Sequence, residues 1–557
     1  MFFKVFRRIF AAGSVIIFIS LCLVFVLSLG AALTPLTAAH NRSVPSAVTA
    51  ARNTGAFFYL VQVLKPAVYT VKIALCSTLI AVTTGVAAAF FTANRRFFGR
   101  RFLLVFSAVP LSIPPLLIAL GFVLAFGING SINRFIASAG TALETAFGVL
   151  RVQGAHKAPA DFLYSFWGIV IVQGFYNFPL VMRLCTDVWQ RLPADEADAA
   201  RLLGASERKV FRTVTFYQLA PTIASAAMLV FLYCFFSFII VLLFGSAGGT
   251  TLEVAVYRSL RASLDFKQGA VFALAETLIA LCFVLLYARL EFSGRKSGGI
   301  TGEAKIFNSK KLRGVGEYLF FAAVFIPVIA FFFVPLFSVS ANAFVHKKML
   351  SFAAFGSVLS RPAFWLSLKN TVYTSAVSAA LAVTGACVYA VFVRSADPLK
   401  TKTWLRLIPL MPMAVSSIVI GFGMIVFFRK GSPLSLIAAQ SALGWPLAFR
   451  SVSSAMNRIP QSTLNAARLL SADFSDSVFR IQLPLLRRSI LSAFGFCFAS
   501  ASADASLPLI LSIPRFETLA LFTYRLAGSY RFSEACAAGS MLAALTILFF
   551  ILGDKLK

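Results

Sequence analysis

Long apolar stretches constrain the fold of this sequence more than any other feature. Twelve of them are apolar over roughly 20 residues each, the length of helix that crosses the hydrocarbon core of a bilayer. They lie at residues 9–33, 67–91, 102–127, 162–186, 220–244, 269–290, 317–338, 370–393, 406–427, 434–452, 489–512 and 535–552. Because lipid offers the backbone no hydrogen-bond partners, such stretches cross as helices. The sequence therefore predicts an all-α polytopic membrane protein with about twelve transmembrane helices.

Composition excludes most other classes of protein. Among 557 residues, 59% are hydrophobic and only 13% are charged, against about 25% charged in a soluble protein. The net charge of +31 is read as Lys and Arg facing lipid head groups and the cytoplasm, not nucleic acid. The eight cysteines stand singly and the three histidines are scattered, which supports neither a metal site nor a disulfide framework. We expect membrane lipids as neighbours, and no nucleic-acid partner, metal or cofactor in this chain.

The distribution of basic residues predicts the orientation. The first stretch follows a basic start, Met1–Arg8, but is longer than the apolar region of a signal peptide, so a retained helix is predicted. Lys and Arg are nearly twice as dense in the loops that are cytoplasmic when the N-terminus is cytoplasmic. Both termini are therefore predicted to be cytoplasmic.

An internal repeat divides the chain. The segment Ala199–Ala205 reappears as Ala466–Ala472, an offset of 267 residues. The same offset pairs Thr251-Leu252 with Thr518-Leu519, and Tyr257-Arg258 with Tyr524-Arg525. Earlier in each half, Val68–Thr70 matches Val372–Thr374, so the first half holds about thirty extra residues. We predict two tandem six-helix units, at 1–290 and 317–557, joined by a polar cytoplasmic linker at 291–316.

The best-matched segment of each unit falls in a loop predicted to be cytoplasmic. In the first unit Pro193 opens a stretch with acids in its first turn, and Gly204 closes it, which predicts a helix of about three turns. Ala197, Ala200 and Gly204 give this helix a smooth face, and Glu196 and Arg201 offer polar anchors. It is interpreted as a rigid rod gripped by a soluble partner. The alternative is an interfacial helix whose Arg reaches lipid head groups.

These residues resemble a known family. Glu196–Ala200, then Gly204, with Pro221 following, is similar to the EAA loop of ATP-binding-cassette (ABC) importer permeases. The resemblance implies that the loop near 193–221 forms a coupling helix that docks on an ATPase subunit. The second copy, near 460–484, is degenerate, with Thr463 in place of Glu196 and Ser471 in place of Gly204. The coupling residues implied are Glu196, Ala197, Ala200, Arg201 and Gly204 in the first unit, and Ala466, Ala467, Arg468 and Ser471 in the second.

The fused two-unit form, with segments 231–238 and 250–257, looks most like the thiamine and ferric-iron permeases. Segments 516–519 and 528–531 are closer to the thiamine type. The resemblance implies a type I importer permease of the bacterial inner membrane that translocates thiamine or a thiamine phosphate, with ferric iron as the alternative. It also implies two ABC ATPase subunits, with ATP bound on them, and a periplasmic or lipid-anchored binding protein. Candidate docking residues for that binding protein are Tyr257, Arg258, Tyr524 and Arg525.

Other classes of function fit less well. The sequence has no Gly-Lys dipeptide and therefore no P-loop, so ATP hydrolysis is expected on separate subunits. Glu276 and Asp504 are the only acids clearly inside apolar stretches, too few for a proton relay. Each of these two acids either has a functional role or pairs with a nearby Ser, Thr or Arg side chain. A stand-alone membrane enzyme or flippase would need a catalytic cluster that is not evident, and an exporter would need no binding protein. We predict a transport subunit, not an enzyme.

Overall fold

The computed structural model describes residues 49–106, 113–127, 130–134, 163–193, 195–245, 249–296, 310–312, 314–346, 349–397, 403–469 and 476–555. In the first half these form α2 (Thr49–Asn94), β1 (Arg95–Arg96), α3 (Arg100–Phe106), α4 (Pro115–Phe126), α6 (Phe166–Trp189), α7 (Asp195–Leu202), α8 (Glu207–Val210), the π-helix η4 (Phe211–Thr215), α9 (Phe216–Phe235), α10 (Phe238–Phe244), α11 (Leu252–Arg261) and α12 (Phe266–Lys296).

The second half begins with β2 (Lys310–Lys311), which pairs in parallel with β1. It continues with α13 (Val315–Val328), the π-helix η5 (Ile329–Phe333), α14 (Val334–Ala343), the antiparallel pair β3 (Val345–His346) and β4 (Met349–Leu350), α15 (Ala353–Leu359), α16 (Pro362–Ala396), α17 (Thr403–Leu407), the 3₁₀-helix η6 (Ile408–Ala414), α18 (Ser417–Phe428), α19 (Pro433–Met456), α20 (Gln461–Leu469), the π-helix η7 (Ser477–Gln482), α22 (Leu483–Ala503), α23 (Ser506–Leu511), α24 (Leu519–Gly528) and α25 (Phe532–Lys555). Apart from these two-residue strands, the regular structure of the described residues is helical, as predicted.

Eight helices in the described part of the chain are long and apolar enough to cross a membrane. A ninth span results if one helix pair, bent by 81°, counts as a single crossing. The eight are Gln62–Asn94, Pro115–Arg134, Phe166–Trp189, Glu207–Phe235, Phe266–Leu290, Val315–Ala343, Pro362–Ala396 and Phe532–Leu552. The prediction of about twelve transmembrane helices is therefore not confirmed.

The four remaining apolar stretches differ for separate reasons. Stretch 9–33 lies outside the described residues. Stretch 406–427 becomes the bent pair Trp404–Ala414 and Ser417–Phe428, because two prolines shape its first part into η6. Stretch 434–452 falls within α19, which is 24 residues long. Stretch 489–512 begins in α22, which is 21 residues long, and continues through α23. Polar side chains such as those of Gln440 and Arg487 lower the hydropathy of these helices.

The two units repeat a hydrogen bond that joins their first long helix to a later one. Thr70 Oγ1 accepts from the backbone nitrogen of Leu252 at 2.9 Å, and Thr371 Oγ1 accepts from that of Leu519 at 2.7 Å. Thr371 is therefore the equivalent of Thr70, and the alignment of Thr70 with Thr374 was wrong by three residues. Thr371 and Thr374 are both buried and stand one turn apart on α16, so the local pattern alone does not separate them.

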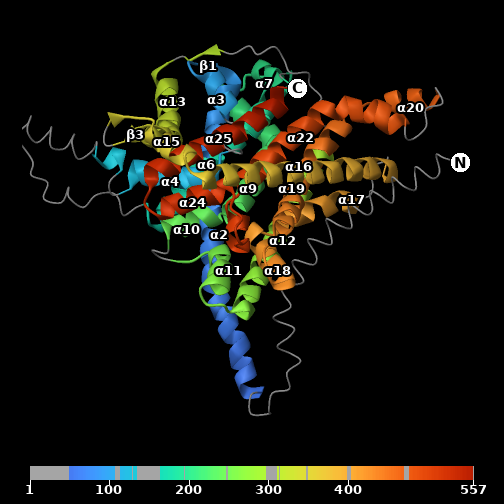
Figure 1. The fold of residues 1–557 in the computed structure, drawn as a ribbon. Helices are drawn as coiled ribbons and strands as arrows, with labels where there is room; N and C mark the ends of the chain where they lie inside the picture. Colours follow the sequence, from blue (N-terminus) through green and yellow to red (C-terminus); the bar gives the residue numbers. More distant parts are fainter. Residues whose placement is uncertain are drawn as a thin grey trace, which may run out of the picture.

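A second repeated hydrogen bond gives the same register. The hydroxyl of Ser77 donates to Gln173 Oε1, and that of Ser378 donates to Gln440 Oε1, each at 3.2 Å. The first bond joins α2 to α6 and the second joins α16 to α19, and both are buried. Each unit therefore repeats both the apolar pattern and the polar contacts that lock its helices together. In Figure 1, α2 runs down the view and α16 runs across it.

Both units break a helix at the equivalent place. In the first, α9 ends at Phe235 and α10 begins at Phe238, with Ser237 in the break. In the second, α22 ends at Ala503 and α23 begins after Asp504 and Ala505. The repeat offset of 267 places Asp504 opposite Ser237. In each unit the helix before the break, α9 or α22, directly follows a π-helix, η4 or η7.

The first span of the second unit packs against the first unit. Phe331 stacks on Phe126, with ring centroids 5.3 Å apart, and lies 5.1 Å from Phe175. Near the other end of this span, Glu317 forms an ion pair with Arg95 of β1, which directly follows α2. The two units are thus joined through aromatic packing of α4 and α6 against η5 and α14.

The crossing of α4 and α14 requires a glycine, which gives a prediction for stability. A Cβ at Gly121 would lie 2.4 Å from the carbonyl oxygen of Pro335, a backbone atom that cannot swing away. We expect Gly121→Ala to destabilise the chain by about 1–3 kcal/mol, the usual cost of overpacking, and to lower its thermal midpoint in detergent. Gly356→Ala is the control, because nothing lies within 4 Å of its Cβ. Equal midpoints for the two variants would contradict the packing argument.

Candidate functional site

The helix predicted in the first loop is present as α7, which is shorter than expected. It runs over eight residues, Asp195–Leu202, and thus begins two residues after Pro193. Gly204 ends it with φ +77°, a conformation that suits glycine. The nitrogens of Gly204 and Ala205 donate to the carbonyls of Arg201 and Ala200 at 2.9 and 3.0 Å, the pattern of a Schellman cap. A well-capped rod of about two turns results.

The side chain of Arg201 forms hydrogen bonds within the loop. Its guanidinium donates to both carboxylate oxygens of Glu207, at 2.8 and 3.1 Å, and to Asp198 Oδ1 at 2.6 Å. These bonds hold the start of α8 against α7. Three of its five N–H donors are thus used within the loop, and the role of Arg201 as an anchor for a partner stays a prediction. Arg201 is a positioning residue for α7.

Glu196 connects α7 to the following span. Gln218 on α9 donates to Glu196 Oε2 at 2.6 Å, and this contact joins residues 22 positions apart. On the other side, Trp189 at the end of α6 stacks on Phe211 of η4, with ring centroids 5.9 Å apart. Helix α7 is therefore tied to α9 by a side-chain hydrogen bond, while α6 packs on η4, so a force on α7 reaches α9 through side chains as well as through the chain.

The surface of α7 differs from the predicted small-residue face. Ala197 and Ala200 are half-buried, whereas Leu202 and Leu203 are 89% and 88% exposed. Two adjacent leucines in water are costly, and an apolar patch of this kind indicates a docking contact. The resemblance to the EAA loop did not point to these leucines. The internal repeat does, because it pairs Leu202 with Leu469, which is 87% exposed on α20.

The second loop forms a comparable helix. Helix α20, Gln461–Leu469, has nine residues and contains Ala466, which is exposed, Ala467, which is buried, and Arg468. Ser471 lies outside the described residues. In Figure 1, α7 stands at the upper edge of the molecule and α20 projects at the upper right. The coupling roles of these residues stay predictions.

The two outer-loop copies meet. Tyr257 on α11 and Tyr524 on α24 are half-buried, and burial, followed by the neighbouring phenol of Tyr257, raises the pKa of Tyr524. Arg258 and Arg525 are exposed beside them. Arg525 forms an ion pair with Glu517 at 3.0 Å. The two tyrosines are thus near each other, and the docking role of the four residues stays a prediction.

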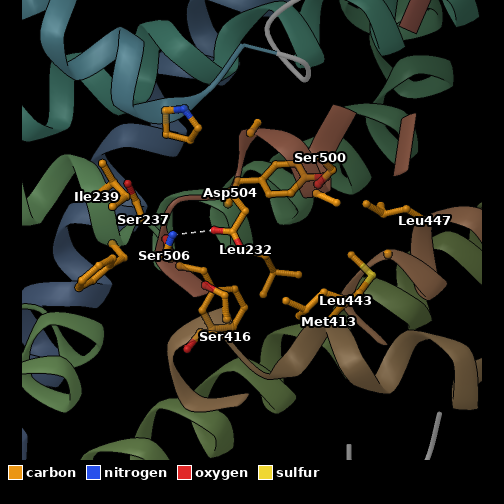
Figure 2. A pocket seen from close by; sticks show the side chains of 18 of the residues that line it. Leu232, Ser237, Ile239, Met413, Ser416, Leu443, Leu447, Ser500, Asp504 and Ser506 are labelled. Carbon is orange, nitrogen blue, oxygen red and sulfur yellow. Dashed lines mark hydrogen bonds between the residues drawn. The ribbon is translucent and has the colours of Figure 1, made fainter. Parts of the chain in front are cut away.

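A cavity of about 330 Å³ lies between the two units. Helices α6, α9 and α10 of the first unit and α18, α19 and α22 of the second contribute its walls, together with both helix breaks. Figure 2 shows part of this lining, including Ser237 from one break and Asp504 from the other. Sequence reasoning named Asp504 only as an acid within a span. Within the described residues, no group of three or more His, Cys, Asp or Glu side chains is placed to hold a metal ion.

Repeated halves, exposed loop helices tied to spans, and a cavity between the halves define a class of protein, the membrane permease. The chain matches the family described as binding-protein-dependent transport system inner membrane component over residues 81–292 and 398–556, and it belongs to that family. It is therefore a multi-pass inner-membrane permease component of an ABC importer, not an enzyme. Transport of this kind implies an ATPase and a binding protein as partners.

Individual relatives resemble the chain over most of its length. The "Thiamine transport system permease protein ThiP" of Brucella abortus (strain 2308) is 26% identical over 505 residues, which cover 87% of this chain and 86% of the relative. The protein of the same name from Escherichia coli (strain K12) is 25% identical, with 87% of each covered. The "Putative ferric transport system permease protein FbpB 1" of Haemophilus influenzae is 23% identical, with 78% of this chain and 68% of the relative covered.

Proposed function

We propose that this chain is the fused permease of an importer for thiamine or a thiamine phosphate. The observation that carries the proposal is the similarity to permeases named for thiamine along 87% of the chain, through both units. It agrees with the resemblance of the segments around Thr250–Tyr257 and Phe516–Leu519 to the thiamine type. The extents 1–290, 291–316 and 317–557 for the two units and their linker, and cytoplasmic termini, belong to the same proposal.

The mechanism follows from how the loops are tied. A binding protein delivers the solute to the outer surface near the Tyr257-Arg258 and Tyr524-Arg525 motifs. Two ATPase subunits, which carry the ATP, hold α7 and α20 and draw them together when they close. Because Glu196 and Arg201 tie α7 to α8 and α9, that movement tilts the spans and changes access to the cavity. Hydrolysis of ATP resets the arrangement.

Ferric iron is the second candidate cargo. It is favoured by one observation, the 23% identity to a permease named for ferric transport, over 78% of this chain. The identity and the coverage are both lower than for the thiamine relatives. Thiamine is therefore the first choice.

Uptake measurements test the proposal. Cells with and without the gene are given labelled thiamine or labelled ferric iron, before and after ATP depletion. We expect thiamine uptake to fall at least tenfold without the gene and after depletion, with iron uptake unchanged. Loss of iron uptake alone would transfer the proposal to the ferric type, and unchanged uptake of both solutes would refute both cargoes.

A further inference from the structure

The cavity between the units carries a charge opposite to that of the chain as a whole. Basic residues outnumber acidic ones by 51 to 20 in the sequence, yet Asp504 is the only residue charged at neutral pH among the described residues that line the cavity. Figure 2 shows its carboxylate among the lining side chains, with Oδ1 accepting a hydrogen bond from the backbone nitrogen of Ser506 at 2.8 Å. Among the described residues Asp504 has no ion-pair partner.

Two more carboxylates lie behind one wall of the cavity. Glu253 on α11 and Glu276 on α12 are each 1% exposed, and none of their four oxygens has a hydrogen-bond partner within the described residues. Both face Ser416, the N-cap of α18 and a cavity residue, although without the geometry of a hydrogen bond. Buried carboxylates without partners are costly. A cationic guest in the cavity would relieve part of that cost.

The fold does not require an acid at Asp504. The repeat offset places Ser237 at the equivalent break of the first unit, where the helix is interrupted in the same way with a neutral side chain. A serine is therefore compatible with this break. Aspartate gives the second unit a negative charge at this break, together with the hydrogen bond from the nitrogen of Ser506, whereas Ser237 makes no such bond at the start of α10.

Aromatic side chains form part of the cavity lining. Tyr176 on α6, with Tyr233 and Phe236 at the end of α9, lines the cavity from the first unit. Tyr176 is held in place by a hydrogen bond to the carbonyl of Ile113 at 3.0 Å. Aromatic faces attract cations and stack on flat rings. A volume of about 330 Å³ lies within the range of small-molecule sites.

We infer that this cavity is a binding site on the transport path for an organic cation with a flat ring. Asp504 is the counter-ion, and Tyr176, Tyr233 and Phe236 hold the ring. The inference rests on the proposed function, because it takes the cavity to be on the path of the delivered solute. To the proposed function it adds the chemical class of solute that the cavity of the permease binds.

The test uses the whole importer, with its ATPase subunits and binding protein, in liposomes supplied with labelled thiamine, a cation with flat rings. Asp504→Ser copies the first unit, Asp504→Asn keeps the shape, and Asp504→Glu keeps the charge. The matched control is Asp265→Asn, which also removes one carboxylate. Asp265 caps α12 by accepting from the nitrogens of Lys267 and Gln268, and asparagine caps equally well.

We expect Asp504→Ser and Asp504→Asn to lower thiamine uptake about tenfold or more, the scale of a lost charged interaction. Asp504→Glu should keep at least a third of the uptake, Asp265→Asn nearly all of it, and every variant its binding-protein-stimulated ATP hydrolysis. Normal uptake by both neutral variants, with uptake still abolished by Glu196→Lys, would overturn the inference and leave the proposed function intact. Loss of the ATPase subunits from all three Asp504 variants would mark a structural residue and also overturn it. Absence of thiamine uptake by the unaltered importer would remove the proposed function, and this inference with it.

Discussion

Replacing Glu196 by Lys is expected to reduce ATP-driven uptake at least tenfold while the chain still assembles with its ATPase. The substitution removes the hydrogen bond from Gln218 to the Glu196 carboxylate, which is 2.6 Å long. Bonds of this charged kind contribute about 1.5–3 kcal/mol. It also puts a positive charge in the first turn of α7, where the helix dipole disfavours it by about 0.3–1 kcal/mol. The readouts are solute uptake and binding-protein-stimulated ATP hydrolysis in proteoliposomes.

The repeated loop supplies the control for this experiment. Thr463 is the equivalent of Glu196 and is exposed on α20, so Thr463→Lys changes the same position without breaking a carboxylate contact. We expect its uptake to fall less than threefold. Glu196→Gln, which keeps an acceptor for Gln218, should be intermediate. Equal losses in Glu196→Lys and Thr463→Lys would show that the two loops contribute equally and that the Gln218 contact is not what matters.

Replacing Leu202 by Asp is expected to weaken the hold of the ATPase on the permease. Leu202 is 89% exposed in the isolated chain, and burying a leucine contributes about 1.5–3 kcal/mol, or roughly tenfold or more in affinity. Leu469→Asp should act in the same direction at the second loop, because Leu469 is 87% exposed. The measurement is the fraction of ATPase that stays with the permease during purification, with and without ATP.

An exposed leucine outside the two loops separates docking from a general effect of the charge. Leu264 is 68% exposed between α11 and α12, with φ +52°, a conformation that aspartate tolerates. Leu264→Asp should therefore retain the ATPase fully. If Leu202→Asp also retained it fully, α7 would not dock through its leucines.

The helical class, the duplication and the position of α7 could be predicted from the sequence because each depends on a local pattern. Apolar length fixes helices, and the proline, acids and glycine of the first loop fix α7. The number of crossings could not, since polar side chains, some buried as in α19 and some exposed like Arg487 in α22, lower the hydropathy of these two helices. Gln440, for example, accepts from Ser378 and donates to the carbonyl of Ala501 at 3.0 Å. Apolar content alone is a poor guide to a buried helix of this kind.

The candidate site likewise has features that could be predicted from the sequence and features that could not. Arg201 was predicted to be a polar anchor for a partner, but its hydrogen bonds within the loop were not predicted. Its use depends on Glu207, six residues on, whose position is set by the turn that Gly204 makes. The cavity was beyond reach for another reason: Ser237 and Asp504 are 267 residues apart, and only the packing of the two units brings them to one space.

The π-helices η4 and η7 have a consequence for how the spans move. Each lies between a loop helix and the span that follows, at Phe211–Thr215 and Ser477–Gln482. A π turn holds one residue more than an α turn. A slip of that residue into α geometry would rotate everything downstream by about 100° around the helix axis, with little change in length. Both units thus place a segment that can change its twist between the loop helix and the following helix, so under the proposed docking of the ATPase a straight pull on the loop would rotate the helix that lines the cavity.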